Sequence, residues 1–161
     1  MATWACGSFL FYFYIFYNIY KLIGFQDTEP VKIVTGIRRC GKSSLLKLMV
    51  AHLLETGISP EQIIEMNFES YAFKDMTADN VYHYVKERIY PNGRTYLFFD
   101  ELQRVPNWET AINAFRVDFN CDIYIISFCT FHKFFYFVLI SYNVWLFGNI
   151  FMREYFDKLN F

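Results

Sequence analysis

In the stretch VKIVTGIRRCGKSSLLKLMVAHLLETG, residues 31–57, the spacing of apolar residues differs before and after a turn that is bounded by glycines. Its first five residues form a short apolar run that is typical of a buried parallel strand. From Lys42 onward, leucine and methionine side chains recur at helical spacing, and Gly57 stands where a helix C-cap is expected. The stretch therefore predicts a strand, a tight turn and a helix in direct succession.

The turn itself, GIRRCGKS at residues 36–43, fits the pattern G-x-x-x-x-G-K-[ST]. Glycines at both ends permit backbone angles that side chains forbid, so successive amides can turn inward around a phosphate. The helix that follows adds the unpaired N–H groups of its first turn. We therefore predict a site for ATP and Mg²⁺, in which Lys42 reaches the β and γ phosphates and Ser43 ligates the metal. The binding residues predicted from this pattern are Gly36, Ile37, Arg38, Arg39, Cys40, Gly41, Lys42, Ser43 and Ser44.

The rest of the central sequence alternates strand patterns with helix patterns, which indicates an α/β fold with a parallel sheet covered on both faces. Further strands are expected at residues 63–68, 95–101 and 122–126, and further helices at residues 78–90 and 107–117.

Two adjacent carboxylates, Asp100 and Glu101, follow the apolar run YLFF. An acid at the carboxyl end of a buried strand can hold Mg²⁺, and the next acid can act as general base toward water. Taken alone, such a pair is usually a turn. Together with the phosphate loop, it predicts Asp100 as a metal ligand and Glu101, with Lys42, as catalytic.

The segments VKIVTGIRRCGKSSLLKL, GISPEQIIEMNFE, YLFFDELQRVPNWETAIN and CDIYI resemble the AAA-type P-loop ATPases of bacteria and archaea that carry a C-terminal domain of uncharacterised role. The resemblance runs from about Tyr20 to Ile125 and includes Gln103 and Trp108. It implies a P-loop NTPase three-layer sandwich, with an incomplete parallel sheet of about four strands. It also implies that the strand at 122–126 lies between the phosphate-loop strand and the Asp100 strand, and that a neighbouring copy's arginine completes the site in a homo-oligomer.

The resemblance ends near Ile126. The family has DIYITGSN at this strand, whereas this chain has Ile126, Ser127, Phe128 and Cys129 after DIYI, so a thiol replaces the asparagine. The family's fifth strand, lid and C-terminal domain have no visible counterpart. Because the phosphate loop supplies most of the nucleotide binding, we expect ATP to bind. Because loss of one positioned donor commonly costs about 10²–10³ in rate, we expect hydrolysis to be weak or absent.

Aromatic residues make up 22% of the 161 residues and concentrate at both ends of the chain. We expect an N-terminal aromatic segment at 1–25, the ATPase domain at 26–127 and a C-terminal aromatic segment at 128–161. Residues 2–20 and 134–152 carry no charge and approach the length of a membrane span. Three interpretations stay open: membrane insertion, packing on the domain, or a shifted coding frame. The first would make this a small membrane-anchored protein with a vestigial nucleotide fold.

The net charge of −1 and the absence of a basic stripe do not support a nucleic-acid partner. Four cysteines lack metal-ligand spacing, and one of them lies in the phosphate loop, so a reducing, cytoplasmic location is expected, with membrane association as the alternative.

Overall fold

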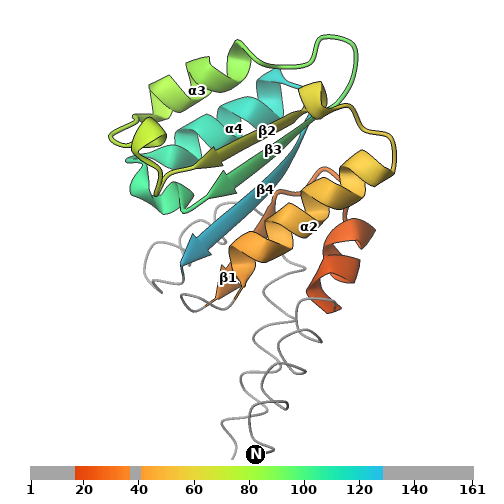
Figure 1. Ribbon diagram of the computed structural model, residues 1–161. Coiled ribbons are helices and arrows are strands. Elements are labelled where there is room, and N and C mark those ends of the chain that lie inside the picture. The colour runs from red at the N-terminus through yellow and green to blue at the C-terminus, as the bar shows by residue number, and fades with distance from the viewer. Residues whose placement is uncertain (1–16, 37–40, 129–161) are drawn as a thin grey trace, which may run out of the picture.

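A computed structural model, which describes residues 17–36 and 41–128, places a parallel sheet between two layers of helices (Figure 1). Residues 17–24 are helical and precede the first strand. The elements that follow are β1 (Lys32–Gly36), α2 (Lys42–Glu55), β2 (Ile63–Asn67), α3 (Ala78–Lys86), β3 (Thr95–Asp100), α4 (Trp108–Asp118) and β4 (Cys121–Phe128), with single 3-10 turns η1 (Pro60–Gln62), η2 (Tyr71–Phe73) and η3 (Leu102–Arg104) between them.

The four described strands are ordered β1-β4-β3-β2, and every neighbouring pair is parallel. The predicted α/β class and the predicted place of the last strand, between the phosphate-loop strand and the Asp100 strand, are both confirmed. Because all four strands point the same way, their carboxyl ends meet at one edge of the sheet. The register aligns Gly36 with Phe128, and it aligns Ile126 with Asp100 and Asp100 with Asn67.

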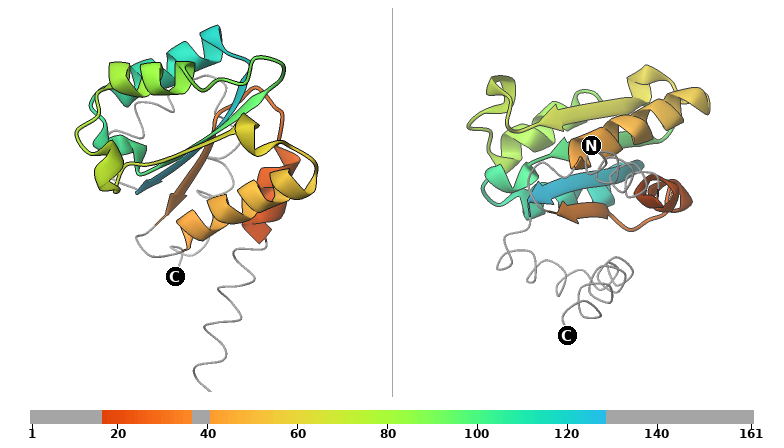
Figure 2. Two further views of the ribbon diagram at one scale, coloured as in Figure 1. Left: turned by 45° about the horizontal axis from the view of Figure 1, so that its top comes forward. Right: turned by 60° about the horizontal axis from the view of Figure 1, so that its bottom comes forward.

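Alternating side chains of the strands fill a separate core on each face of the sheet. α3 and α4 cover one face, and α2 with the helix at 17–24 covers the other (Figure 2). The first core includes Leu97, Phe99, Ile123, Ile125, Ile112 and Phe115. The second includes Phe98, Tyr124, Ile126, Leu45, Met49 and Leu53, with the Phe98 and Tyr124 rings stacked at 4.7 Å between centroids.

The helix at residues 17–24 contributes to this second core, since Ile19 and Leu22 are buried there. Part of the predicted N-terminal segment, 1–25, therefore packs against the sheet domain, while the proposed boundaries at 25 and 127 remain predictions. The two uncharged stretches lie almost wholly outside the described residues. Within residues 17–36 and 41–128, no helix combines the length and the apolar character needed to cross a membrane.

The carboxyl ends of α2 and α3 are each set by local hydrogen bonds, and the second differs from the sequence-based prediction. α2 ends in a Schellman motif, because Ile58 N–H donates to Leu53 O at 3.0 Å and Gly57 N–H to Leu54 O at 3.1 Å, with φ of Gly57 at 94°. α3 was expected to reach residue 90 but ends at Lys86. The Tyr90 amide donates to the Thr95 hydroxyl at 3.0 Å instead of continuing the helix, so the chain turns back toward β3.

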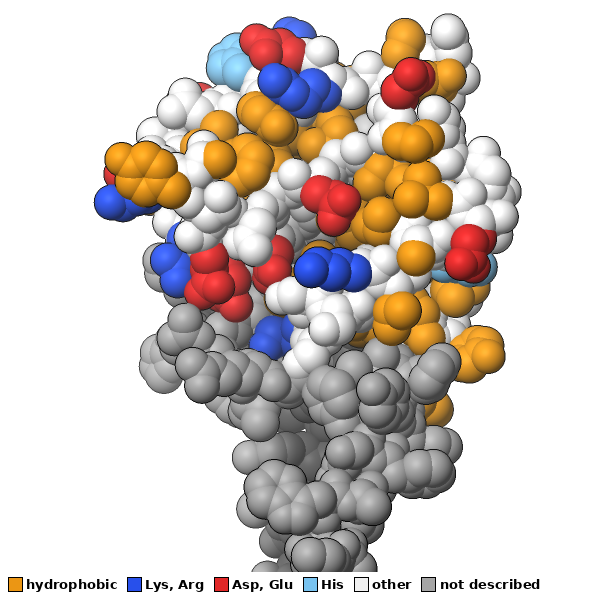
Figure 3. All heavy atoms as spheres, in the orientation of Figure 1, with side chains coloured by type: hydrophobic (Ala, Val, Ile, Leu, Met, Phe, Trp, Pro, Cys, Tyr) orange, Lys and Arg blue, Asp and Glu red, His pale blue; other side chains and the backbone are white. Residues whose placement is uncertain are grey.

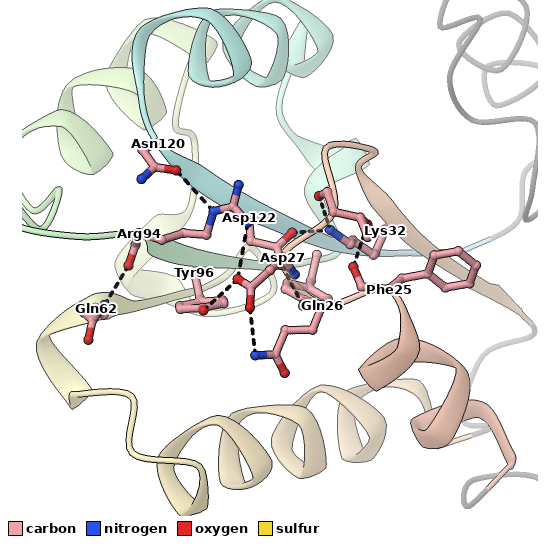
Figure 4. Close-up of polar contacts among 11 residues, drawn as sticks. Phe25, Gln26, Asp27, Lys32, Gln62, Arg94, Tyr96, Asn120 and Asp122 are labelled. Atoms are coloured by element: carbon pink, nitrogen blue, oxygen red, sulfur yellow. Dashed lines mark hydrogen bonds and ion pairs between the residues drawn. The ribbon is translucent and has the colours of Figure 1, made fainter.

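A buried polar network joins the amino ends of the strands, at the edge opposite Asp100 (Figure 4). Lys32 of β1 and Asp122 of β4 form an ion pair, and each side chain is 1% exposed. The Lys32 ammonium also donates to Thr28 O at 2.7 Å, and the Asp122 carboxylate accepts from the Tyr124 hydroxyl and the Asp27 amide, both at 2.9 Å. Burial lowers the pKa of Lys32, and Asp122 offsets only part of that shift.

Asp27 extends this network to the surface. Its carboxylate accepts from the Tyr96 hydroxyl at 2.8 Å and pairs with Arg94 at 3.3 Å. Burial acts to raise the pKa of Asp27, but hydrogen bonds from Tyr96, Gln26 and Arg94 outweigh it and hold that pKa below its ordinary value. The segment that follows the N-terminal helix is thereby tied to β1, β3 and β4 at once.

We expect Lys32→Met to lower the free energy of unfolding by about 3–5 kcal/mol, because it leaves the Asp122 carboxylate buried without a cation. Lys32→Met combined with Asp122→Asn removes both charges and keeps an acceptor for the Tyr124 hydroxyl, so it should recover part of the loss. Urea unfolding of both variants measures this coupling.

Arg88→Met provides the matched control, because Arg88 and Glu87 form an ion pair whose side chains are 46% and 73% exposed. Its loss should cost less than about 1 kcal/mol. A double variant that is no more stable than Lys32→Met would contradict the coupling.

The pH dependence of stability should carry a Tyr96 contribution. Burial, followed by the hydrogen bond to Asp27 and nearby negative charge, raises the pKa of Tyr96 from 10.0 to about 12. The contribution is complete below pH 10 and disappears as the pH rises toward 12, because the folded state holds its proton longer than the unfolded state. Between pH 10 and 12, the wild type should therefore lose more stability than Tyr96→Phe in chemical unfolding. Parallel curves would contradict this assignment.

Candidate nucleotide site

The start of α2 has a left-handed glycine at the second glycine of the predicted phosphate-loop pattern. Gly41 is the N-cap residue, with φ 86° and ψ 13° in the left-handed region, and its carbonyl accepts from Leu45 N–H at 3.1 Å. Lys42 is the first residue of the helix and is 8% exposed, whereas Ser43 and Ser44 are exposed on the first turn. The amides of this turn have no intrahelical acceptor, so they form a positive end at the carboxyl edge of the sheet.

The Ser43 hydroxyl donates a hydrogen bond to Asp100 Oδ2 at 2.8 Å. These two residues are 57 positions apart in the sequence. Ser43 lies on the helix that follows β1 and Asp100 ends β3, and β4 lies between these two strands. The first turn of α2 therefore reaches across the end of β4 to the end of β3. This contact brings together the two halves of the predicted site.

The second oxygen of Asp100 is buried and has no hydrogen-bond partner among the described residues. A buried carboxylate oxygen is costly to leave unpaired, and such atoms in native structures commonly serve an ion or a substrate. The Ser43 hydroxyl and the Asp100 carboxylate together offer adjacent oxygen donors, which is the ligand chemistry that Mg²⁺ prefers. These residues therefore fit a magnesium ion that keeps most of its water and phosphate ligands.

Glu101 has a left-handed backbone, with φ 58° and ψ 36°. The other non-glycine residues with positive φ in the described part of the chain are Asp27, Asp75 and Asn107, which are of the types that tolerate this region. A glutamate there stores backbone strain, which concentrates at functional sites. The Glu101 amide donates to Ile126 O at 3.0 Å, so the end of β4 holds the strained residue in place.

The Glu101 side chain accepts a hydrogen bond from Gln103 Nε2. Gln103 belongs to η3, whose Leu102 side chain is 1% exposed and anchors the turn in the core. Gln103 Oε1 is buried and, like Asp100 Oδ1, has no hydrogen-bond partner among the described residues. One of these oxygens belongs to the last residue of β3, and the other belongs to the 3-10 turn that follows it.

The remaining predicted residues divide into two groups. Gly36 ends β1 opposite Phe128, beside the site, and Ser127 lies in register with Thr35 near the end of β4. Ile37, Arg38, Arg39 and Cys40, together with Cys129, lie outside the described residues, so their predicted roles stay predictions.

A separate hollow of about 560 Å³ lies beyond η3, away from Ser43 and Asp100. Its lining includes Phe68, Phe73 and Met76 from the segment between β2 and α3, and Arg104, Val105 and Pro106 after β3. None of the predicted site residues contributes to it. We therefore do not count it as part of the nucleotide site.

Sequence reasoning placed Gln103 in the family pattern without giving it a role, because a single glutamine carries no motif. The contact with Glu101 depends on the left-handed turn, which nothing in the sequence DELQ signals. The buried pair at the other edge left a clearer trace. Lys32 in VKIVT and Asp122 in CDIYI are single charges inside otherwise apolar strands, and such charges require a partner when buried.

Comparison with known proteins agrees with this geometry. The AAA domain family matches residues 28–127. The chain belongs to this family. An uncharacterized protein of Haemophilus influenzae is 38% identical to this AAA domain chain over 108 residues, a match that covers 65% of the chain and 27% of that relative. No solved structure matches the chain.

Membership in the AAA family indicates nucleotide binding of the ATPase type, and AAA domains generally bind ATP with Mg²⁺. Since the match covers 27% of the Haemophilus protein, whatever the longer protein does is a separate question.

We expect Gly41→Ala to lower the free energy of unfolding by about 1–2 kcal/mol, because an alanine side chain disfavours the left-handed conformation at φ 86°. Gly57→Ala is the matched control at the other end of α2, with φ 94° and no heavy atom within 4 Å of an added Cβ. Thermal or urea unfolding should give similar losses for both. A neutral Gly41→Ala would contradict the cap geometry.

Proposed function

We propose that this AAA domain binds Mg·ATP at the carboxyl edge of its sheet and hydrolyses it slowly. Lys42 contacts the β and γ phosphates, and the amides of residues 36–44 surround the phosphate chain. Ser43 and Asp100 hold Mg²⁺, which when bound neutralises charge on the phosphate oxygens. Glu101 is the general base that accepts a proton from the attacking water.

The observation that carries this proposal is the hydrogen bond between Ser43 Oγ and Asp100 Oδ2. Two motifs that the sequence separates by more than 50 residues supply oxygen donors within hydrogen-bond distance of each other, and the unpartnered Asp100 Oδ1 lies at the same place. A turn that served only to begin a helix would not be expected to hydrogen-bond to a half-buried carboxylate at the end of a strand two positions away in the sheet.

Turnover is expected to be slow because residues near and just after the end of β4 differ from those of the resembling family. Ile126 occupies the position where the resembling family has a threonine, and Cys129 takes the place of the asparagine that would orient water. Loss of one such donor commonly costs about 10²–10³ in rate. A homo-oligomer, in which a neighbouring copy supplies an arginine, remains part of the proposal, in keeping with the assembly common among AAA domains.

Surface charge favours a nucleotide over a nucleic acid as the ligand. On the face shown in Figure 3, Lys and Arg side chains are interspersed with Asp and Glu side chains. The net charge of the chain is −1. A phosphate backbone requires a continuous cationic surface, whereas a single nucleotide requires only the local helix end and Lys42.

We expect Lys42→Ala to weaken Mg·ATP binding by about 10–100-fold, because it removes a charge-assisted hydrogen bond worth about 1.5–3 kcal/mol. Lys47→Ala is the matched control, since Lys47 is exposed on the same helix. Isothermal titration calorimetry with ATP and Mg²⁺ measures both affinities.

Equal and weak affinities in the wild type and Lys42→Ala would contradict the proposal. Repeating the titration of Asp100→Asn with and without EDTA tests the metal separately, because the chelator should weaken ATP binding to the wild type more than to this variant.

A further inference from the structure

Only one of the two polar atoms of the Gln103 carboxamide has a hydrogen-bond partner among the described residues. Its Nε2 donates to Glu101 Oε2, and its Oε1 is buried without a hydrogen-bond partner among the described residues. Leaving a buried amide oxygen without a hydrogen bond is energetically costly. The orientation of the amide is fixed by Glu101, because a carboxylate accepts only from the NH₂ group and not from the oxygen. Oε1 is therefore held as an acceptor.

The backbone that carries Gln103 is held at several points. Arg104 N–H donates to Glu101 O at 3.1 Å and Val105 N–H to Leu102 O at 3.0 Å, which closes the 3-10 turn. Leu102 and Val105 are 1% and 3% exposed in the core beneath. Glu101 itself is fixed by its left-handed backbone and its bond to Ile126 O. The Glu101 carboxylate and the Gln103 amide are thus held next to each other by a well-fixed turn.

This pair suits a water molecule that attacks a phosphate. A water has two hydrogens, and a general base takes only one of them. We propose that Gln103 is a positioning residue for hydrolysis: its Nε2 orients the Glu101 carboxylate, and its Oε1 accepts the second hydrogen of the attacking water. In the step itself, the water oxygen bonds to the γ-phosphorus and its proton passes to Glu101. The bond from phosphorus to the bridging oxygen breaks, and ADP leaves with that electron pair.

The inference rests on the proposed function, because it gives Gln103 a role in the chemistry of the same site. It goes beyond that function in separating binding from turnover at one residue. Lys42, Ser43 and Asp100 serve binding. Gln103 contacts neither the phosphate loop nor Asp100 through any hydrogen bond in the described residues, so its loss should leave ATP affinity unchanged.

The test uses the full chain with Gln103→Met, which keeps the length and volume of the side chain but removes both polar atoms. Arg104→Met is the control in the same turn, since it breaks only the exposed ion pair with Glu69, at 3.0 Å. Isothermal titration gives the Kd for Mg·ATP, and single-turnover hydrolysis of radiolabelled ATP with protein in excess gives the chemical rate even when turnover is slow.

We expect Gln103→Met to bind Mg·ATP with the wild-type Kd and to hydrolyse it at least about tenfold more slowly. Arg104→Met should match the wild type in both measurements. Gln103→Asn, whose shorter side chain keeps the same amide, should restore part of the rate if hydrogen bonding rather than packing is what matters.

Three results would overturn the inference. One is an unchanged single-turnover rate in Gln103→Met. Another is a faster rate, which would make Gln103 a restraint on Glu101 rather than a support. The third is a wild type that binds ATP without cleaving it, since there would then be no attacking water to orient. A wild type that does not bind ATP would instead refute the proposed function, so the two failures are distinguishable.

Discussion

The site depends on a single topological constraint, which is that β4 lies between β1 and β3 with all strands parallel. Neighbouring strands are about 4.8 Å apart, so the ends of β1 and β3 are separated by roughly twice that distance. The first turn of α2 spans this gap and places the Ser43 hydroxyl 2.8 Å from the Asp100 carboxylate. An antiparallel or consecutive strand order would put the two motifs at different places on the sheet. The chemistry of this edge is therefore a consequence of strand order before it is a consequence of side chains.

The opposite edge of the sheet shows how that order is maintained. Lys32 and Asp122, one from each of the adjacent strands β1 and β4, are both buried and paired, and Asp27 links them to the N-terminal helix. A buried ion pair of this kind adds little net stability compared with apolar residues, but a mispaired strand would leave one charge without its partner. The pair therefore penalises alternative strand orders more than it stabilises the native one. This ion pair lies at the amino edge of the sheet, whereas Ser43 and Asp100 lie at the carboxyl edge. The residues that favour the native strand order are therefore different from those of the candidate nucleotide site.

The strands and main helices could be predicted from local sequence patterns, whereas the strand order was predicted only from the family resemblance. The phosphate-loop pattern, the apolar runs and the acids after YLFF gave the strands, the main helices and the family. The predicted end of α3 lies four residues beyond the end in the structure. The Tyr90 amide bonds to the Thr95 hydroxyl across a turn instead of continuing the helix. The left-handed Glu101 and its contact with Gln103 could not be predicted, since a glutamate gives no local signal for positive φ. Periodicity predicts which face is buried, but it does not predict which polar atoms meet.

At Ile126, near the end of β4, the backbone and the side chain make different contributions to the site. The carbonyl of Ile126 accepts from the Glu101 amide, and any residue at that position could provide the same carbonyl. Replacing the family's threonine with isoleucine therefore leaves the support of Glu101 intact and extends the core beneath α2, where Ile126 is fully buried. What the replacement removes is a hydroxyl at the carboxyl edge. Under the proposed function, ATP binding rests on the α2 turn and Asp100 and does not require that hydroxyl, whereas water activation requires it. The same substitution can thus preserve the architecture of the site and slow its chemistry, which is the combination that the proposed function assigns to this chain.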